Sequence, residues 1–364
     1  MAGDRRYYCY KDVLPFAAMV TMECFNVGLN TLYKAATLRG MSYHVFIVYS
    51  YAVAAFLLLP APFFSNRSRV LPSVNFSIVS KIGLLGIIGC TSQIMGYTGI
   101  IYSSPTLASA ISNLVPAFTF ILAVTFRMET LSFSKKSTRA KCLGTIVSVT
   151  GAFVVTLYKG PKIIWNISSS PSGSMPVSLG SSQPNWALGG LFLTSEYILV
   201  PLWYIVQTQI MKEYPAELTV VFFYNLIVSI LAAIVASFTE PDSSAWKIKP
   251  DIALASILCS GVLGSCLNNS VHTWALRLKG PLFVSMFKPL SIAIAVVMGV
   301  MFLGDDLYLG SVIGAAIISI GFYTVMWGKA KEDAIKAEVV NLESSSTPRS
   351  PLLQYYKDED VERR

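Results

Sequence analysis

Apolar stretches of roughly twenty residues recur along nearly the whole chain, separated by short polar segments. Because a helix rises about 1.5 Å per residue, some 20 apolar residues cross a hydrocarbon core of about 30 Å. A backbone in lipid must satisfy its own N–H and C=O groups, and no alternating pattern suggests a barrel, so these stretches are predicted to be helices. We place the predicted spans at residues 13–33, 43–64, 76–98, 104–127, 140–158, 187–210, 217–239, 251–274, 281–303 and 307–327.

Composition supports this interpretation, since the 364 residues are 54% hydrophobic and only 13% charged. A soluble domain carries about 25% charged residues. The net charge is +8, and most Lys and Arg residues fall in the predicted loops on the side of the membrane that carries both termini. This asymmetry indicates the topology. The positive-inside rule then places the N- and C-termini in the cytosol. We therefore predict an all-α polytopic membrane protein with ten transmembrane helices and no nucleic-acid partner.

A loop rich in Ser, Pro and Gly divides the chain into two halves of five predicted spans each. Short blocks match across it, pairing Glu23 with Glu196, Tyr51 with Tyr224, and Pro116 with Pro289. An odd number of spans inserts the second half in the opposite direction, as in carriers that hold a site near the midplane. The predicted organisation is a cytosolic arm (1–12), a first five-helix repeat (13–158), an extracytosolic linker (159–186), a second five-helix repeat (187–327) and a disordered cytosolic tail (328–364).

Polar side chains inside the predicted spans are the candidate site residues, because polar groups in lipid are costly. Their helical spacing puts each set on one face. We expect the first, third, fourth, sixth, eighth and ninth spans to line a central cavity that binds a small solute. The candidates are Glu23, Asn26, Asn30, Gln93, Tyr97, Ser112, Asn113, Glu196, Trp203, Gln207, Asn268, Asn269, His272, Ser285 and Lys288.

The charged candidates allow more than one role. Glu23 and Glu196 lie about halfway along their spans, where lipid opposes ionisation, so they are the candidates for proton coupling. Lys288 either neutralises one of them as a structural ion pair or anchors a substrate carboxylate directly. His272 is either a hydrogen-bonded packing residue or a solute ligand.

Prolines and glycines in the spans suggest where helices bend or touch. Pro116, Pro201 and Pro289 each remove a backbone hydrogen bond, so we treat them as hinge candidates, with a static kink as the alternative. The Gly310-x-x-x-Gly314 pattern permits close helix contact, either within the chain or between two copies. The sequence thus leaves a monomer and a homodimer both open.

The run from residue 102 to residue 120 resembles the fourth-helix signature of the plant nodulin-like EamA transporters. Residues 279–281, 287–291 and 307–315 are similar to the ninth and tenth helices of the same family. This family, also called UMAMIT or WAT1-related, belongs to the drug/metabolite transporter superfamily. The resemblance implies ten helices in two inverted EamA repeats and transport of small organic solutes, which are amino acids for many members and auxin for a vacuolar relative. Many members carry Asn where this chain has Lys288.

The function predicted from the sequence is a secondary carrier that moves amino acids by alternating access, with or without protons. The alternative substrate is auxin or another organic anion. An intramembrane enzyme is disfavoured, because the chain has no HExxH motif and Gly304-Asp305 lacks the upstream glycine of a GxGD protease. A receptor or scaffold would leave the duplicated halves without a use. We predict no cofactor and no metal site, and we expect the plasma membrane first and the vacuolar membrane second.

Overall fold

The computed structural model describes residues 13–37, 39–63, 75–102, 108, 111–129, 135–158, 160–164, 186–243, 245–248, 250–298 and 307–346. Within these residues the chain is helical apart from two short strands. The predicted arm (1–12), most of the predicted linker and residues 347–364 lie outside them. The elements are α2 (Leu14–Thr37), α3 (Tyr43–Leu58), α5 (Phe76–Tyr102), α7 (Val115–Thr125), α8 (Lys136–Leu157), β1 (Lys162–Ile164), α9 (Trp186–Glu213), α10 (Glu217–Thr239), α11 (Ile252–Cys259), η2 (Ser260–Asn268), α12 (Asn269–Lys279), α13 (Pro281–Ser285), α14 (Phe287–Met298), β2 (Leu307–Tyr308) and α15 (Leu309–Ser346).

Seven helical segments in the described part of the chain are long and apolar enough to cross a membrane. They are Tyr43–Phe63, Phe76–Ile100, Lys136–Val155, Ala187–Glu213, Glu217–Thr239, Ile252–Lys279 and Leu309–Glu332. Two shorter apolar helices, Val115–Thr125 and Pro281–Ile294, and the more polar α2 fall on the remaining predicted spans. The chain is therefore an integral multi-pass membrane protein, while the count of ten crossings stays a prediction.

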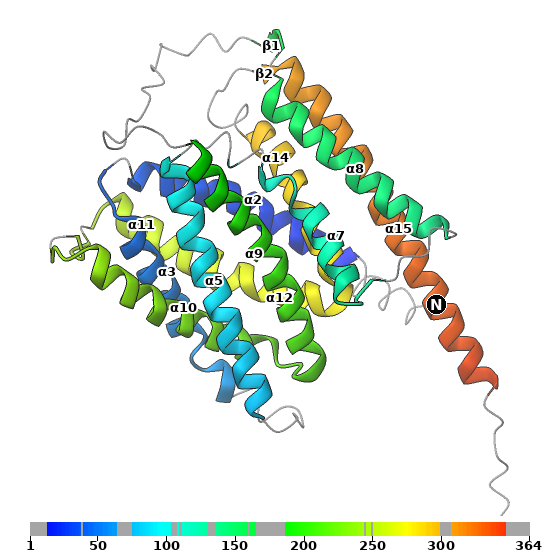
Figure 1. Cartoon of the computed structure of the whole chain (residues 1–364), viewed down its shortest axis with the longest axis horizontal. Helices are drawn as coiled ribbons and strands as arrows, with labels where there is room; N and C mark the ends of the chain where they lie inside the picture. Colours follow the sequence, from blue (N-terminus) through cyan, green and yellow to red (C-terminus); the bar gives the residue numbers. More distant parts are fainter. Residues whose placement is uncertain are drawn as a thin grey trace, which may run out of the picture.

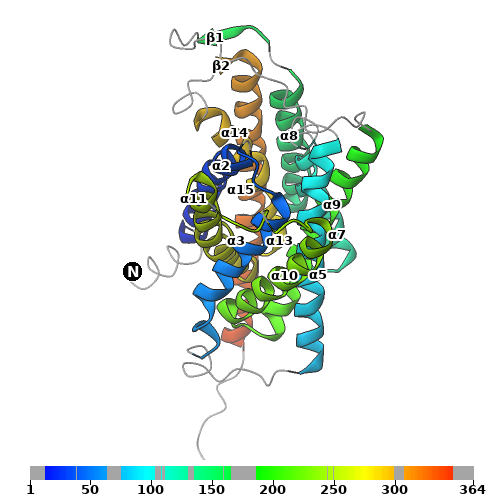
Figure 2. The ribbon, with the colours of Figure 1, turned by 90° about the vertical axis from the view of Figure 1, so that its left-hand side faces the viewer.

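Helices α8 and α15 lie side by side and run in opposite directions along one edge of the molecule (Figure 1). At one end β1 pairs antiparallel with β2, and the N–H of Leu309 donates to the carbonyl of Pro161 over 2.9 Å. At the other end the hydroxyl of Ser137 donates to the carbonyl of Gly328 over 2.8 Å. Figure 2 shows the same pair from the side. The last span of one predicted half is thus antiparallel to the last span of the other.

Glycines allow this close approach between α8 and α15. A Cβ on Gly144 would lie 2.7 Å from the carbonyl oxygen of Gly321, and a Cβ on Gly314 would lie 2.8 Å from that of Gly151. Only hydrogen fits at such distances, since real Cβ atoms do not come this near to backbone atoms. Gly314, from the predicted Gly310-x-x-x-Gly314 pattern, therefore contacts a helix of its own chain.

A second antiparallel pair joins the predicted halves through α3 and α10. The hydroxyl of Ser42 at the start of α3 donates to Glu240 just after α10 over 2.7 Å. Farther along, the hydroxyl of Ser229 donates to the carbonyl of Val48 over 3.2 Å. These are the second and seventh predicted spans. Because matching spans would run parallel in halves inserted the same way, both antiparallel pairs support inverted halves.

The central helices pack in the same pattern when the two halves are exchanged. Helix α2, the first predicted span, packs against the α11–η2–α12 rod and against α14, the eighth and ninth spans. Helix α9, the sixth span, packs against α5 and α7, the third and fourth spans. The helices predicted to line a central cavity therefore pack as two matching groups, one around α2 and one around α9.

Three helices differ in detail from the sequence prediction. Helix α15 continues to Ser346, so the predicted start of a disordered tail at residue 328 is wrong; residues 329–346 are rich in Ala, Lys and Glu, which favour helix. Pro116 is at the start of α7 and Pro289 is in the first turn of α14, where a missing N–H breaks no helical bond. Of the three hinge candidates, only Pro201 lies in the interior of its helix, α9.

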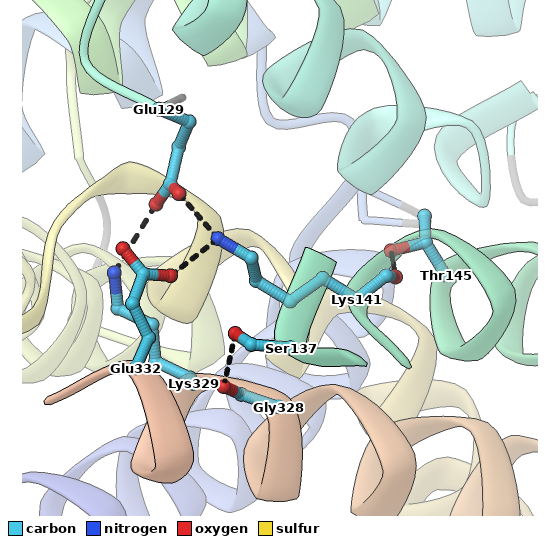
Figure 3. Close-up of polar contacts among 7 residues, drawn as sticks. All are labelled: Glu129, Ser137, Lys141, Thr145, Gly328, Lys329 and Glu332. Carbon is cyan, nitrogen blue, oxygen red and sulfur yellow. Dashed lines mark hydrogen bonds and ion pairs between the residues drawn. The ribbon is translucent and has the colours of Figure 1, made fainter. Parts of the chain in front are cut away.

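Four charged side chains, which we call the charge clasp, join the end of α7 to α8 and α15 (Figure 3). Lys141 Nζ lies 2.5 Å from Glu129 Oε2 and 2.6 Å from Glu332 Oε2, and Lys329 Nζ lies 3.1 Å from Glu129 Oε1. The side chain of Lys141 is only 1% exposed. Backbone N–H groups of residues 126–129 bond back into the last turn of α7, which fixes Glu129 in place. The clasp ties the C-terminal end of α7 to the α8–α15 pair.

Candidate functional site

Polar and charged side chains from both predicted halves converge in the middle of the helix bundle. We call Glu23, Glu196 and Lys288 the charged triad. Glu23 comes from α2, Glu196 from α9 and Lys288 from the first turn of α14. The ammonium of Lys288 interacts electrostatically with both carboxyls, more strongly with that of Glu23. The sequence predicted these three residues as candidates, and the fold brings them together.

Glu23 is enclosed by protein. Glu23 is 1% exposed, and its Oε1 atom has no hydrogen-bond partner among the described residues. One helical turn away, the side-chain amide of Asn26 donates to Asn268 Oδ1 over 3.2 Å. That bond ties α2 to the end of η2, so it fixes the position of Glu23 against the eighth predicted span.

Glu196 lies against the backbone of α5. A Cβ on Gly96 would lie 2.5 Å from the carboxyl carbon of Glu196, so a glycine is required to seat this carboxyl. The rings of Tyr97 and Tyr197 interact electrostatically with Glu196, and the hydroxyl of Tyr197 is hydrogen-bonded to Ser112. The third, fourth and sixth predicted spans therefore meet at this carboxyl.

Lys288 follows a break in the ninth predicted span. Helix α13 ends at Ser285, a turn at Met286 intervenes, and Pro289 lacks the N–H that would bond back across the break. No direct ion pair joins Lys288 to Glu23 or Glu196 within the described residues, although it faces both. Opposite charges that face each other without contact can bind a solute between them. A direct ion pair serving helix packing alone is thus disfavoured.

His272 and Tyr204 both lie close to Lys288. His272 Nδ1 lies 2.9 Å from the carbonyl oxygen of Asn268, so the ring donates there and Nε2 is the acceptor in the neutral form. The ring of Tyr204 stacks on that of His272 at 6.4 Å between centroids. Tyr204 interacts electrostatically with both Lys288 and Glu23. His272 is a bonded, stacked residue that faces Lys288, so its two predicted roles are compatible.

An aromatic group extends the polar cluster toward α3 and α10. The ring of Trp203 lies 5.5 Å from that of Tyr224, which in turn lies 6.1 Å from Tyr51. Gln93 lies near the hydroxyl of Tyr51. Gln207 donates from Nε2 to the hydroxyl of Thr273 over 2.8 Å, which joins α9 to α12.

Other predicted candidates lie elsewhere or are engaged in helix packing. Asn30 is exposed. Ser285 is buried and donates to the carbonyl of Leu282 in its own helix over 2.9 Å. Asn269 donates to Asn225 Oδ1 over 3.3 Å. Asn113 is buried in the turn just before α7.

Three residues that were not predicted from the sequence also belong to this polar region. Asn225 on α10 is fully buried, donates to the carbonyl of Ser265 over 3.3 Å and accepts from Asn269. Ser265 belongs to η2, a nine-residue π-helical segment between α11 and α12. Short π segments inside helices often mark functional sites. Asn225, Tyr204 and Tyr197 gave no sequence signal beyond being polar or aromatic residues in apolar spans.

Comparison with known proteins identifies the family. The sequence profile of the EamA-like transporter family matches residues 188–327. One WAT1-related protein of Arabidopsis thaliana is 64% identical over 98% of this chain and 99% of its own length, and another is 52% identical over 99% of this chain and 98% of its own length. A crystal structure aligns with a TM-score of 0.58 at 13% identity, covering 83% of this chain and 97% of that chain, and shows a shared fold.

These relatives match almost end to end, and the matching profile describes membrane transporters, which is consistent with a chain that is not an enzyme. The chain belongs to the plant WAT1-related EamA family of the drug/metabolite transporter superfamily.

Proposed function

We propose that this transporter is a secondary carrier that moves small organic solutes by alternating access, with the solute held at the charged triad. The observation that carries the proposal is the sharing of Lys288 between carboxyls of opposite predicted halves. A site at the junction of two inverted halves can open to either face when one half rocks against the other. Our candidates for the hinges are Pro201 inside α9, Pro116 at the start of α7 and Pro289 in the first turn of α14.

Amino acids are the first substrate class that we propose. A zwitterion carries an ammonium and a carboxylate, and the triad offers a carboxyl for the first and Lys288 for the second. Asn26 and Asn268 supply neutral donors and acceptors near Glu23. The unpartnered Oε1 of Glu23 is a ready acceptor for a solute ammonium.

The second candidate is auxin or another organic anion. Lys288 favours it, because a half-buried ammonium between helices attracts a carboxylate. The stacked rings of Tyr204 and His272 would suit the flat ring of an aromatic acid. The two carboxyls oppose an anion unless they are protonated, which is why we place this class second.

Uptake by the purified protein in liposomes tests the proposal. We expect time-dependent, saturable uptake of at least one neutral amino acid or aromatic acid, lost in Lys288→Ala and retained in Lys81→Ala, whose ammonium lies at the end of α5 away from the triad. A wild-type protein that moves no member of a broad solute panel would contradict the carrier. Equal uptake by both variants would show that Lys288 does not bind the solute.

We further propose cytosolic termini and, as the first location to examine, the plasma membrane, with the vacuolar membrane second. The cationic residues Lys135, Lys136 and Arg139 at the start of α8 fall on the proposed inner side. A fluorescent tag on the full-length chain gives the membrane, and protease protection of tagged termini gives the orientation.

A further inference from the structure

The charged triad has an unbalanced set of charges. Two carboxyls and one ammonium sum to −1 when all three are ionised. The other titratable groups that face them are neutral tyrosines and one histidine. Tyr204 lies near Lys288 and Glu23, His272 lies near Lys288, and Tyr97 and Tyr197 lie near Glu196. Among the described residues, no second cation balances the site.

Both carboxyls are held inside the helix bundle. Glu23 is 1% exposed, and the carboxyl of Glu196 lies against Gly96 of α5. Lys288 interacts electrostatically with both carboxyls. A solute of amino-acid size bound beside Lys288 can therefore reach either carboxyl.

A net charge enclosed by protein in a membrane is costly, so conformations that occlude the site will favour zero total charge. We propose that the site changes from one face to the other only when its total charge is zero, so that the solute and the bound protons together carry one positive charge. This inference rests on the proposed carrier function and adds to it a rule that links substrate charge to proton number. The protons reside on the carboxyl oxygens of Glu23 or Glu196.

The rule fixes the stoichiometry for each class of solute. The empty site returns with one proton, and a zwitterion crosses together with one proton, so a full cycle moves the zwitterion alone. A monocation replaces the proton, so it exchanges for one proton per cycle. A monoanion crosses with two protons and the empty site returns with one, so it enters with one net proton. No cycle moves net charge.

Glutamine, lysine and glutamate test the rule, because they share a backbone and differ in net charge. With purified wild-type protein in liposomes, an imposed potential of about 100 mV would change accumulation by about fiftyfold for each charge moved. We expect no change for whichever of the three is transported. We also expect a proton gradient to drive lysine toward the acidic side and glutamate toward the alkaline side, and to leave glutamine at equal concentrations.

The variant Glu196→Gln sharpens the test, because it makes the sum of ionised groups zero without changing side-chain size. Whatever the overall rate of this variant, its ratio of lysine–proton exchange to glutamine transport should be at least tenfold lower than that of the wild type. Glu213→Gln, at the far end of the same helix beside Lys81, is the matched control and should behave as wild type.

Potential-driven glutamine accumulation by the wild type would overturn the charge rule while leaving the carrier function intact. Absence of uptake of every probe by the wild type would contradict the carrier function itself. Undiminished lysine–proton exchange in Glu196→Gln would overturn the assignment of the balancing proton to the triad.

Discussion

Removal of the buried ammonium of the charge clasp, in Lys141→Met, should destabilise the protein markedly. Lys141 contacts two carboxylates and is 1% exposed, and the side chain of Glu129 is 5% exposed. Stranding one member of a buried ion pair costs about 3–5 kcal/mol. Glu332 is 18% exposed and can regain water, and Lys329 still contacts Glu129, so we expect about 2–4 kcal/mol.

Thermal unfolding of the detergent-solubilised protein, followed by the loss of the monodisperse peak in size-exclusion chromatography, measures this effect. At roughly 2 °C per kcal/mol for a chain of this size, the midpoint should fall by about 4–8 °C. Lys81→Met is the control, because its partner Glu213 is 46% exposed and such surface pairs contribute about 0–1 kcal/mol. Adding Glu129→Gln to Lys141→Met should restore part of the loss, since it removes the stranded charge.

Equal midpoints for Lys141→Met and Lys81→Met would refute this reasoning. So would a double variant whose loss of stability equals the sum of its two single changes, because the two charges would then act independently of each other.

Other predictions follow from close contacts. Gly96→Ala should reduce transport at least tenfold, because its Cβ would displace the Glu196 carboxyl, whereas Gly83→Ala on the same helix meets no atom within 4 Å and should transport normally. Gly321→Ala should lower the unfolding midpoint, since its Cβ would lie 2.7 Å from a backbone oxygen of α8; an unchanged midpoint would contradict the tight packing of that pair. Asn225→Ala should slow transport without loss of expression, because η2 loses its buried donor; normal flux would exclude a role for that bond.

The sequence predicted the charged triad because lipid makes an ionisable side chain conspicuous. Glu23, Glu196 and Lys288 stood out among apolar neighbours, and the duplicated halves indicated that they could meet. Tyr204 and Asn225 were missed, since a tyrosine or a single asparagine in a span is common and only the packing partner reveals its role. No local sequence pattern predicts that Tyr204 stacks on His272, because the two residues are 68 positions apart along the chain.

Helix boundaries were predicted less well where polar segments follow apolar ones. The end of the last predicted span was set by hydropathy, but hydropathy does not report that α15 continues through residues with good helix propensity. The charge clasp was not predicted, because Glu129, Lys329 and Glu332 lie outside the predicted spans and Lys141 lies at the start of one. The burial of Glu129 and Lys141 depends on α15, 191 residues from Lys141 at the Glu332 contact.

Access to the charged triad from both faces of the membrane is the central claim. In a variant whose native cysteines are replaced, a cysteine at Gln93, beside Tyr51, can be labelled with a membrane-impermeant thiol reagent in right-side-out and in inside-out vesicles. We predict labelling in both orientations, slowed in both by a transported solute. Labelling from one face only, under all conditions and with transport intact, would contradict alternating access at this site.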